Sequence, residues 1–391
     1  MIYNRQRHQI ALGHRTPVEY AAAIDLDGCL RGCQDSRARS RTARPSKFWG
    51  STMEYPVGWY WASFGEDLRR GQVRSVEYMG QRYALFRTRR GDVGMLRAQC
   101  CHMGADLGRA GKVIGERLVC GYHGWEFGTS GRCEHMPQVQ RIPERACQPT
   151  VPVVERAGNI WFWYGTPEPS KPFPDVSYFD DRSEFLTIKG EAHLGRCDPL
   201  PIIEHVADVY HFEHNHRASG PLEYTILRNE GDIFEFQLRP KEGGPSKIQR
   251  LFRPYAFTEM VGPCTALYRT QDGPEIDRRT PMLTMVLGVT PIRENETVWT
   301  WRVVVRRPLR RRRMALPVDY AFARLLWLII RRNVHVDLDV INWMDPPERD
   351  LWVKPDTSSV RDFRAFYRRN MPSVAASGPV AEAVLTGASA T

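Results

Sequence analysis

Two short segments of this 391-residue chain each carry one cysteine and one histidine at close spacing. One residue separates Cys100 from His102, two separate Cys120 from His123, and seventeen lie between the two pairs. Two thiolates and two imidazoles are the donor set of a [2Fe–2S] cluster in which the cysteines hold one iron and the histidines the other. A structural zinc ion is the alternative, but each segment of a zinc finger usually carries two cysteines or two histidines. The interleaved order therefore favours the iron–sulfur cluster.

A second group of possible metal ligands lies in the segment 204–216. Glu204, Asp208 and His211 have the i, i+4, i+7 spacing of one helical face. His216 follows five residues after His211 and would reach the same ion if the helix loosens there. Two histidines and one carboxylate on one side of Fe(II) form a facial triad, which leaves positions open for water, substrate and O2. A solvated polar helix, or histidines hydrogen-bonded in a core, is the alternative explanation.

The elements that position these ligands differ between the two parts of the chain. Short strand-like runs separated by turn residues predict a small antiparallel β domain from residue 53 to 166, and prolines then mark a linker. Residues 167–372 mix strands with helices, including a strand over 297–305 and a helix over 318–344. Residues 1–52 are expected to be a disordered extension, and residues 373–391 a flexible tail.

Composition excludes several classes of protein. With 42% hydrophobic residues the chain can fill a large core, and its length favours two domains. No apolar run is long enough to span a bilayer and no secretory signal is evident, so we expect a cytoplasmic protein. Nine cysteines are an odd number and argue against a fully paired secreted protein.

The net charge of +10 and the basic run over 306–313 could attract nucleic acid, an acidic redox partner or an anionic membrane surface. No nucleic-acid-binding motif accompanies the charge, so nucleic acid is not an expected partner. The apolar run Leu325 to Ile330 could form a membrane-surface helix, but packing in the core is the expected role.

The segments Cys100-Cys101-His102-Met103-Gly104 and Cys120-Gly121-Tyr122-His123-Gly124-Trp125 resemble the two cluster-binding loops of Rieske non-haem iron oxygenases. The family more often has proline at the positions of Cys101 and Gly121. Cys101 could compete as a thiolate, but the Cys-x-His register selects Cys100. Other stretches, such as Glu155 to Gly165, look most like the branch that contains aminopyrrolnitrin oxygenase, with steroid-hydroxylating enzymes as near cousins.

The resemblance implies roles for the second group of residues. Asp208-x2-His211-x4-His216 matches the family's iron motif, which makes His211 and His216 ligands of the mononuclear iron and disfavours His205 and His214. The third ligand is implied in the late helix, where an aspartate precedes an aromatic residue by four positions. That register selects Asp339, four residues before Trp343, over Asp337.

Asp208 is implied to link His211 to the cluster ligand His123 of a neighbouring subunit, which implies a homotrimer. The implied fold is α+β: an all-β Rieske domain followed by a helix-grip catalytic domain, in which a curved antiparallel sheet packs over a long helix.

The implied activity is that of an oxygenase component without a second subunit type. A ferredoxin or flavin reductase would supply electrons from NAD(P)H, and O2 would oxidise a small apolar or aromatic substrate, an arylamine among the options, by monooxygenation. The alternative is a Rieske-type electron carrier or regulatory iron–sulfur protein, which would not need His211, His216 or Asp339 as ligands.

Overall fold

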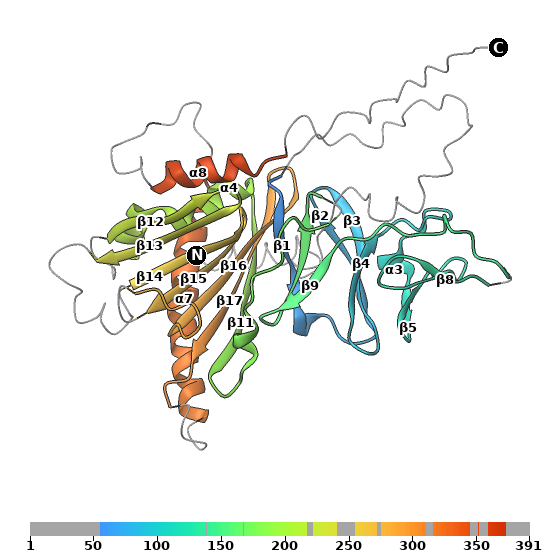
Figure 1. Ribbon diagram of the computed structural model, residues 1–391, viewed down its shortest axis with the longest axis horizontal. Helices are drawn as coiled ribbons and strands as arrows, with labels where there is room; N and C mark the ends of the chain where they lie inside the picture. The colour runs from blue at the N-terminus through green and yellow to red at the C-terminus, as the bar shows by residue number, and fades with distance from the viewer. Residues whose placement is uncertain are drawn as a thin grey trace, which may run out of the picture.

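The computed structural model describes residues 55–137, 139–166, 168–216, 222–240, 255–271, 275–309, 316–344, 351 and 359–372. The predicted extension (1–52) and tail (373–391) lie outside these residues, as does most of the basic run after Arg307. Small β-sheets form one end of the molecule, and a large sheet with helices forms the other (Figure 1). The predicted α+β class is therefore confirmed.

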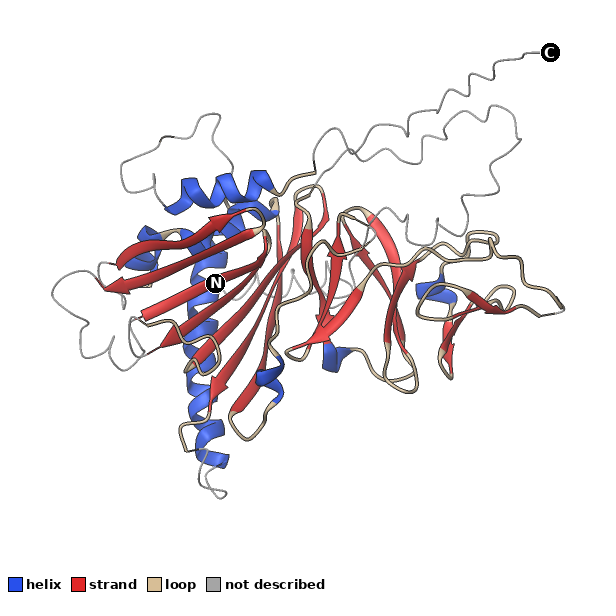
Figure 2. Cartoon of the chain, viewed as in Figure 1, coloured by secondary structure: helices blue, strands red, loops and turns tan. Residues whose placement is uncertain are grey.

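A seven-stranded antiparallel sheet dominates the second part of the chain, in the order β11-β17-β16-β15-β14-β13-β12. Its strands are β11 (Phe185–Gly195), β12 (Leu222–Glu230), β13 (Ile233–Pro240), β14 (Tyr255–Gly262), β15 (Thr265–Gln271), β16 (Leu283–Arg293) and β17 (Glu296–Arg306). The long helix α7 (Leu316–Ile341) crosses one face of the sheet, and α8 (Ser359–Arg369) lies across one end (Figures 1 and 2). This is the predicted sheet over a long helix.

The first part of the chain contains three smaller antiparallel sheets. They are β1-β10-β9 (Gly58–Phe64, Asn159–Tyr164, Val153–Arg156), β2-β3-β4 (Val73–Tyr78, Gln81–Arg87, Val93–Arg97) and β5-β6-β7-β8 (Lys112–Ile114, Arg117–Val119, Glu126–Phe127, Cys133–His135). A single helical turn, α3 (Leu107–Ala110), precedes β5. Short 3-10 turns are η3 (Gly65–Asp67), η4 (Ser177–Asp180) and η5 (Glu204–Ala207).

The large sheet is covered on both faces. Nine of the eleven residues of strand β17 are buried. Trp301 and Val303 belong to the core shared with α7, whereas Val304 packs against the tryptophans of β1 and β10 on the other face. The sheet is therefore the middle layer of a three-layer packing, which explains why both sides of the strand are apolar.

Strand β1 is fixed to the large sheet by hydroxyl groups and a close approach. Thr265 Oγ1 donates to the carbonyl of Trp59 at 2.7 Å, and Thr290 Oγ1 donates to that of Trp61 at 2.9 Å. A Cβ at Gly288 would lie 2.7 Å from the Cβ of Trp61, so glycine is required for this contact. One apolar core runs across the predicted boundary at 166/167, and that division stays a prediction.

The segment predicted as one helical face over 204–216 is interrupted, so that prediction was wrong. Helix α4 (Pro199–Ile203) continues into η5, the backbone is extended at Asp208 (ψ 104°), and α5 (Val209–Asn215) begins after it. The cause is the Asp208 carboxylate, which accepts hydrogen bonds from the N–H groups of Tyr210 and His211 and so caps α5. Asp208 thus starts a new helix and sets the direction of the histidines that follow.

Within the described chain, no helix is both long and apolar enough to cross a membrane. Leu325 and Leu328 on α7 are exposed, whereas Leu326, Trp327 and Ile330 pack against the core. The expected core packing of this run therefore holds for one side of the helix.

Candidate metal centres and pocket

The two Cys/His loops have the same backbone construction. The N–H of Cys100 donates to the carbonyl of Ala105, and the N–H of Cys120 to that of Trp125, each at 2.8 Å. Gly104 and Gly124 each donate back to the cysteine of their own loop and have positive φ values of 77° and 72°. Such a turn favours glycine, because φ > 0 is costly for residues with a Cβ.

The donor groups of the loops converge. The thiols of Cys100 and Cys120 are buried and close enough to interact, and the rings of His102 and His123 lie 4.6 Å apart, centroid to centroid, at the surface. Trp125 stacks on His102 at 4.4 Å with an angle of 8° between the rings. Two inner thiols and two outer imidazoles match the asymmetric ligation of a Rieske cluster, so the residues fit this group.

Cys101 occupies a different position from Cys100. Its side chain is exposed, and its N–H donates to Oε1 of Gln148 at 2.8 Å. Gln148 is fully buried, and its Nε2 donates to the carbonyls of Arg97 and Gln99 at 2.6 and 2.7 Å. The buried amide thus fastens the first loop to the adjoining strand β4. The Cys101 thiol hydrogen-bonds the thiol of Cys100, although Cys101 as a residue is exposed. No pattern in the sequence indicated this role of Gln148.

His211 is held in one tautomer by the residue that caps its helix. Its Nδ1 donates to the backbone carbonyl of Asp208 at 2.7 Å, which leaves Nε2 with a free lone pair. Burial, reinforced by the neighbouring His205, lowers the pKa of His211 to about 2. The ring is therefore neutral at physiological pH and able to bind a metal.

The carboxylate that faces the histidines is Asp337, not the predicted Asp339. Asp337 Oδ1 lies 3.3 Å from Nε2 of His216 and 3.4 Å from Nε2 of His205, whereas Asp339 is exposed on the other side of α7. Ile330, Val334 and Ile341 face inward with Asp337 at helical spacing. This apolar stripe was the signal that could have selected Asp337.

His205 is closer to this group than the family spacing implied. The donor atoms of His205, His211 and Asp337 all lie within 4.8 Å of one another. The rings of His211 and His216 lie 5.2 Å apart at 81°. His205 Nε2, His216 Nδ1 and Asp337 Oδ1 are buried without a hydrogen-bond partner among the described residues. Buried ring nitrogens and a buried carboxylate oxygen left without hydrogen bonds fit a metal ion with nitrogen and carboxylate ligands.

An apolar pocket opens beside these ligands. Its cavity volume is about 180 Å³, smaller than the ~300–1,000 Å³ typical of small-molecule sites. Apart from the metal-binding candidates, its lining is Ile202, Val206, Phe212, Tyr268, Leu283, Met285, Leu287, Trp299, Ile330, Asn333 and Val334. None of the described lining residues is a lysine or arginine, so the pocket suits a neutral, largely apolar molecule.

Glu204 does not join the metal-binding group. Nε and Nη2 of Arg364, on α8, donate to its two carboxylate oxygens at 2.6 and 3.0 Å. The pair fixes the turn that leads into His205 and gives the C-terminal helix a role that its sequence did not reveal.

Comparison with known proteins decides between the possible families. Residues 58–152 match the model of the Rieske [2Fe-2S] domain, and residues 160–369, more than half of the chain, match that of the 3-ketosteroid 9alpha-hydroxylase C-terminal domain. The chain belongs to the Rieske oxygenases. The resemblance of the cluster loops to this family is thereby confirmed.

Among its relatives, this Rieske oxygenase is 33% identical over 192 residues to cholesterol 7-desaturase nvd of Xenopus laevis, covering 46% of this chain and 40% of that protein. It is 29% identical to aminopyrrolnitrin oxygenase PrnD of Pseudomonas fluorescens, over 43% of this chain and 48% of that protein. It is 30% identical to the oxygenase component of 3-ketosteroid-9-alpha-monooxygenase of Rhodococcus rhodochrous (54% and 52%). The chain thus spans about half the length of the curated relatives it matches.

Solved structures of similar fold include apo dicamba monooxygenase, with a TM-score of 0.62 and 22% identity over 82% of this chain and 98% of that one. NdmB of Pseudomonas putida CBB5 has the same TM-score, with 17% identity over 79% and 89% of the two chains. These likenesses establish that the fold of the Rieske oxygenases extends over most of the chain.

Proposed function

We propose that the chain is the oxygenase component of a monooxygenase that oxidises a neutral, largely apolar small molecule with O2. The observation that carries the proposal is the apolar pocket lined by His211, His216 and Asp337. When bound, the Rieske cluster supplies electrons singly and a mononuclear iron activates O2. An electron carrier or regulatory iron–sulfur protein would need neither this pocket nor the second set of donors.

For the mononuclear iron, we propose the ligands His211, His216 and Asp337. The two histidines are supported by the Asp-x2-His-x4-His spacing that resembles the family's iron motif. Asp337 is favoured over Asp339 because its carboxylate lies beside His216, whereas Asp339 is exposed. His205 competes with His216, since its donor atom lies within 4.8 Å of those of His211 and Asp337. His216→Asn should lose the mononuclear iron, whereas His205→Asn should keep it. If His216→Asn retains the iron and His205→Asn loses it, His205 is the ligand and His216 is not.

The substrate class is inferred from the pocket lining. Phe212, Tyr268 and Trp299 present aromatic surface, and the indole N–H of Trp299 has no hydrogen-bond partner among the described residues. A carbonyl or hydroxyl on an apolar ring system would accept from it. Relatives named for cholesterol, 3-ketosteroids and aminopyrrolnitrin are in keeping with such a molecule. A sterol, a ketosteroid or an arylamine is the class we propose.

Asp208 is proposed to connect the two metal centres between chains of a homotrimer. In Figure 1 the elements that flank the cluster loops (β4, α3 and β5) and the helix that bears Asp337 (α7) lie toward opposite ends of one chain. The rings of His102 and His123 are exposed, and the Asp208 side chain keeps 32% of its surface accessible. An exposed carboxylate next to His211 can therefore meet a cluster histidine of a neighbouring chain.

The proposed electron donor is a ferredoxin or flavin reductase that draws on NAD(P)H. The net charge of +10 would steer an acidic donor toward the chain and make the association rate fall with salt.

The test combines metal analysis with labelled oxygen. The reconstituted protein should hold about three irons per two acid-labile sulfides. With a surrogate reductase and ¹⁸O₂, a panel of sterols, ketosteroids and arylamines should give a product one labelled oxygen heavier, or a desaturated product. His211→Ala should abolish turnover and leave the visible spectrum of the cluster intact. Two irons per two sulfides in the wild type would refute the oxygenase assignment.

A further inference from the structure

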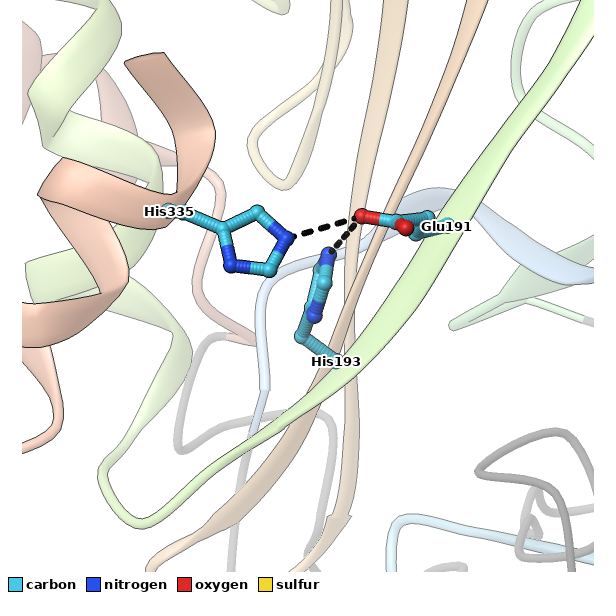
Figure 3. A group of neighbouring side chains, drawn as sticks. All are labelled: Glu191, His193 and His335. Carbon is cyan, nitrogen blue, oxygen red and sulfur yellow. Dashed lines mark hydrogen bonds and ion pairs between the residues drawn. The ribbon is translucent and has the colours of Figure 1, made fainter. Parts of the chain in front are cut away.

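A second cluster of metal-binding side chains lies away from the pocket, between the edge strand β11 and helix α7. Glu191 and His193 project from β11 toward the helix, and His335 projects from α7 toward them (Figure 3). Pairing of β11 with β17 shifts register between Lys189 and Ala192. The bulge re-aims this part of the strand.

Three side chains of α7, each one turn after the last, contact the bulged segment. Trp327 Nε1 donates to the carbonyl of Lys189 at 2.9 Å, and Arg331 Nε donates to Glu191 Oε1 at 2.7 Å. His335 Nε2 lies 3.0 Å from Glu191 Oε2. The carboxylate is thus oriented by Arg331 through one oxygen, and its other oxygen faces both imidazoles.

The distances within the cluster match a small cation. Glu191 Oε2 lies 3.0 Å from His335 Nε2 and 3.4 Å from His193 Nε2, and the two rings lie 5.2 Å apart at 83°. Nitrogen and oxygen ligands about 2.0–2.1 Å from a tetrahedral zinc ion are about 3.3 Å from one another. Two histidines and one glutamate, with water as the fourth ligand, form a known zinc coordination set.

The imidazoles are able to donate to a metal. Burial lowers the pKa of His193 to about 4, so its ring is neutral near pH 7. Trp301 Nε1 lies 3.5 Å from His193 Nε2, at the limit of a hydrogen bond, and engages that lone pair weakly. His335 is partly exposed, which gives an ion access from solvent.

We infer that Glu191, His193 and His335 form a second metal site, which binds a divalent transition ion such as Zn²⁺ and is separate from the proposed iron site. The ion would cross-link the edge strand of the large sheet to α7, two residues before Asp337. It would also add to the metal content of the protein without contributing electrons, because Zn²⁺ has no redox chemistry. The site stands whether or not the proposed oxygenase activity is correct.

The test measures Zn²⁺ uptake by the full-length protein with its cluster and mononuclear iron loaded. After equilibrium dialysis against micromolar Zn²⁺, elemental analysis should find one more zinc per chain in the wild type than in His335→Ala or Glu191→Gln. Affinity in these variants should fall ~100-fold or more, because each removes a ligand. His214→Ala, which removes an exposed histidine outside the cluster, should bind like the wild type.

Melting temperature provides the second readout. Zn²⁺ should raise it by a few degrees in the wild type and in His214→Ala, but not in His335→Ala. An unchanged visible spectrum of the cluster verifies that each variant is folded. Equal uptake in the wild type, Glu191→Gln and His335→Ala, or no uptake in any of them, would show that the three side chains form an ion-pair network only.

Discussion

Exchanging the two aspartates of α7 for asparagine, one at a time, separates the two candidate ligand registers. Asp337→Asn replaces a buried carboxylate that lies 3.3 and 3.4 Å from His216 and His205. Asp339→Asn makes the same chemical change two residues later, on the exposed side of the helix. The pair is matched in size, charge and helix position, so a difference between the variants reports on the surroundings of each carboxylate.

The magnitudes follow from burial and contact. Loss of a residue that merely supports a metal ligand costs about 10- to 100-fold in affinity, so loss of the ligand itself should cost at least ~100-fold, or about 2.8 kcal/mol. Asp337→Asn should then lose the mononuclear iron on dialysis. Asp339→Asn should change stability by no more than about 0.5 kcal/mol, as is usual for a surface substitution.

The assay is iron and sulfide analysis after dialysis against a weak chelator, together with turnover. We expect about two irons per two sulfides and no turnover in Asp337→Asn, and about three irons with normal turnover in Asp339→Asn. The cluster spectrum should be the same in both. Iron retained in Asp337→Asn and lost in Asp339→Asn would refute the reasoning from burial. Asp339, the aspartate four residues before Trp343, would then be the ligand.

Three further predictions concern the parts that position the two centres. Cys100→Ala should abolish the visible spectrum of the cluster while Cys101→Ala preserves it; loss in both would make Cys101 a ligand. Arg364→Met should lower the free energy of unfolding by about 3–5 kcal/mol in urea denaturation, because Glu204 is left charged and buried; a change below ~1 kcal/mol would contradict this. Gln148→Leu should cost about 1–3 kcal/mol and hasten cluster loss, since three backbone groups lose their partner; unchanged cluster lifetime would remove its proposed supporting role.

The cluster loops could be predicted from sequence because their ligands are local. Each loop brings a cysteine and a histidine within four residues, and glycine at the positive-φ position completes the turn. The alternation of strand and turn residues likewise predicted the small sheets. Local patterns of this kind do not depend on how distant segments pack.

The carboxylate that lies near the histidines depends on packing, and sequence reasoning selected Asp339, two residues away from Asp337. The choice of Asp339 relied on Trp343, a residue that is 84% exposed. The break at Asp208 was missed because i, i+4 spacing looks the same in one helix and in two helices joined by a capping residue. The Glu191 and His335 contact joins residues 144 positions apart, and no sequence pattern links them.

Helix α7 carries both a wall of the pocket and the carboxylate of the proposed iron site, with consequences for redesigning substrate scope. Val334 and Ile330 line the pocket one and two turns before Asp337, so larger or smaller residues there would tilt the helix and move the carboxylate. Leu283 and Met285 line the pocket from β16, which bears none of the proposed metal ligands. Libraries that vary β16 should therefore alter selectivity with less loss of turnover than libraries that vary α7.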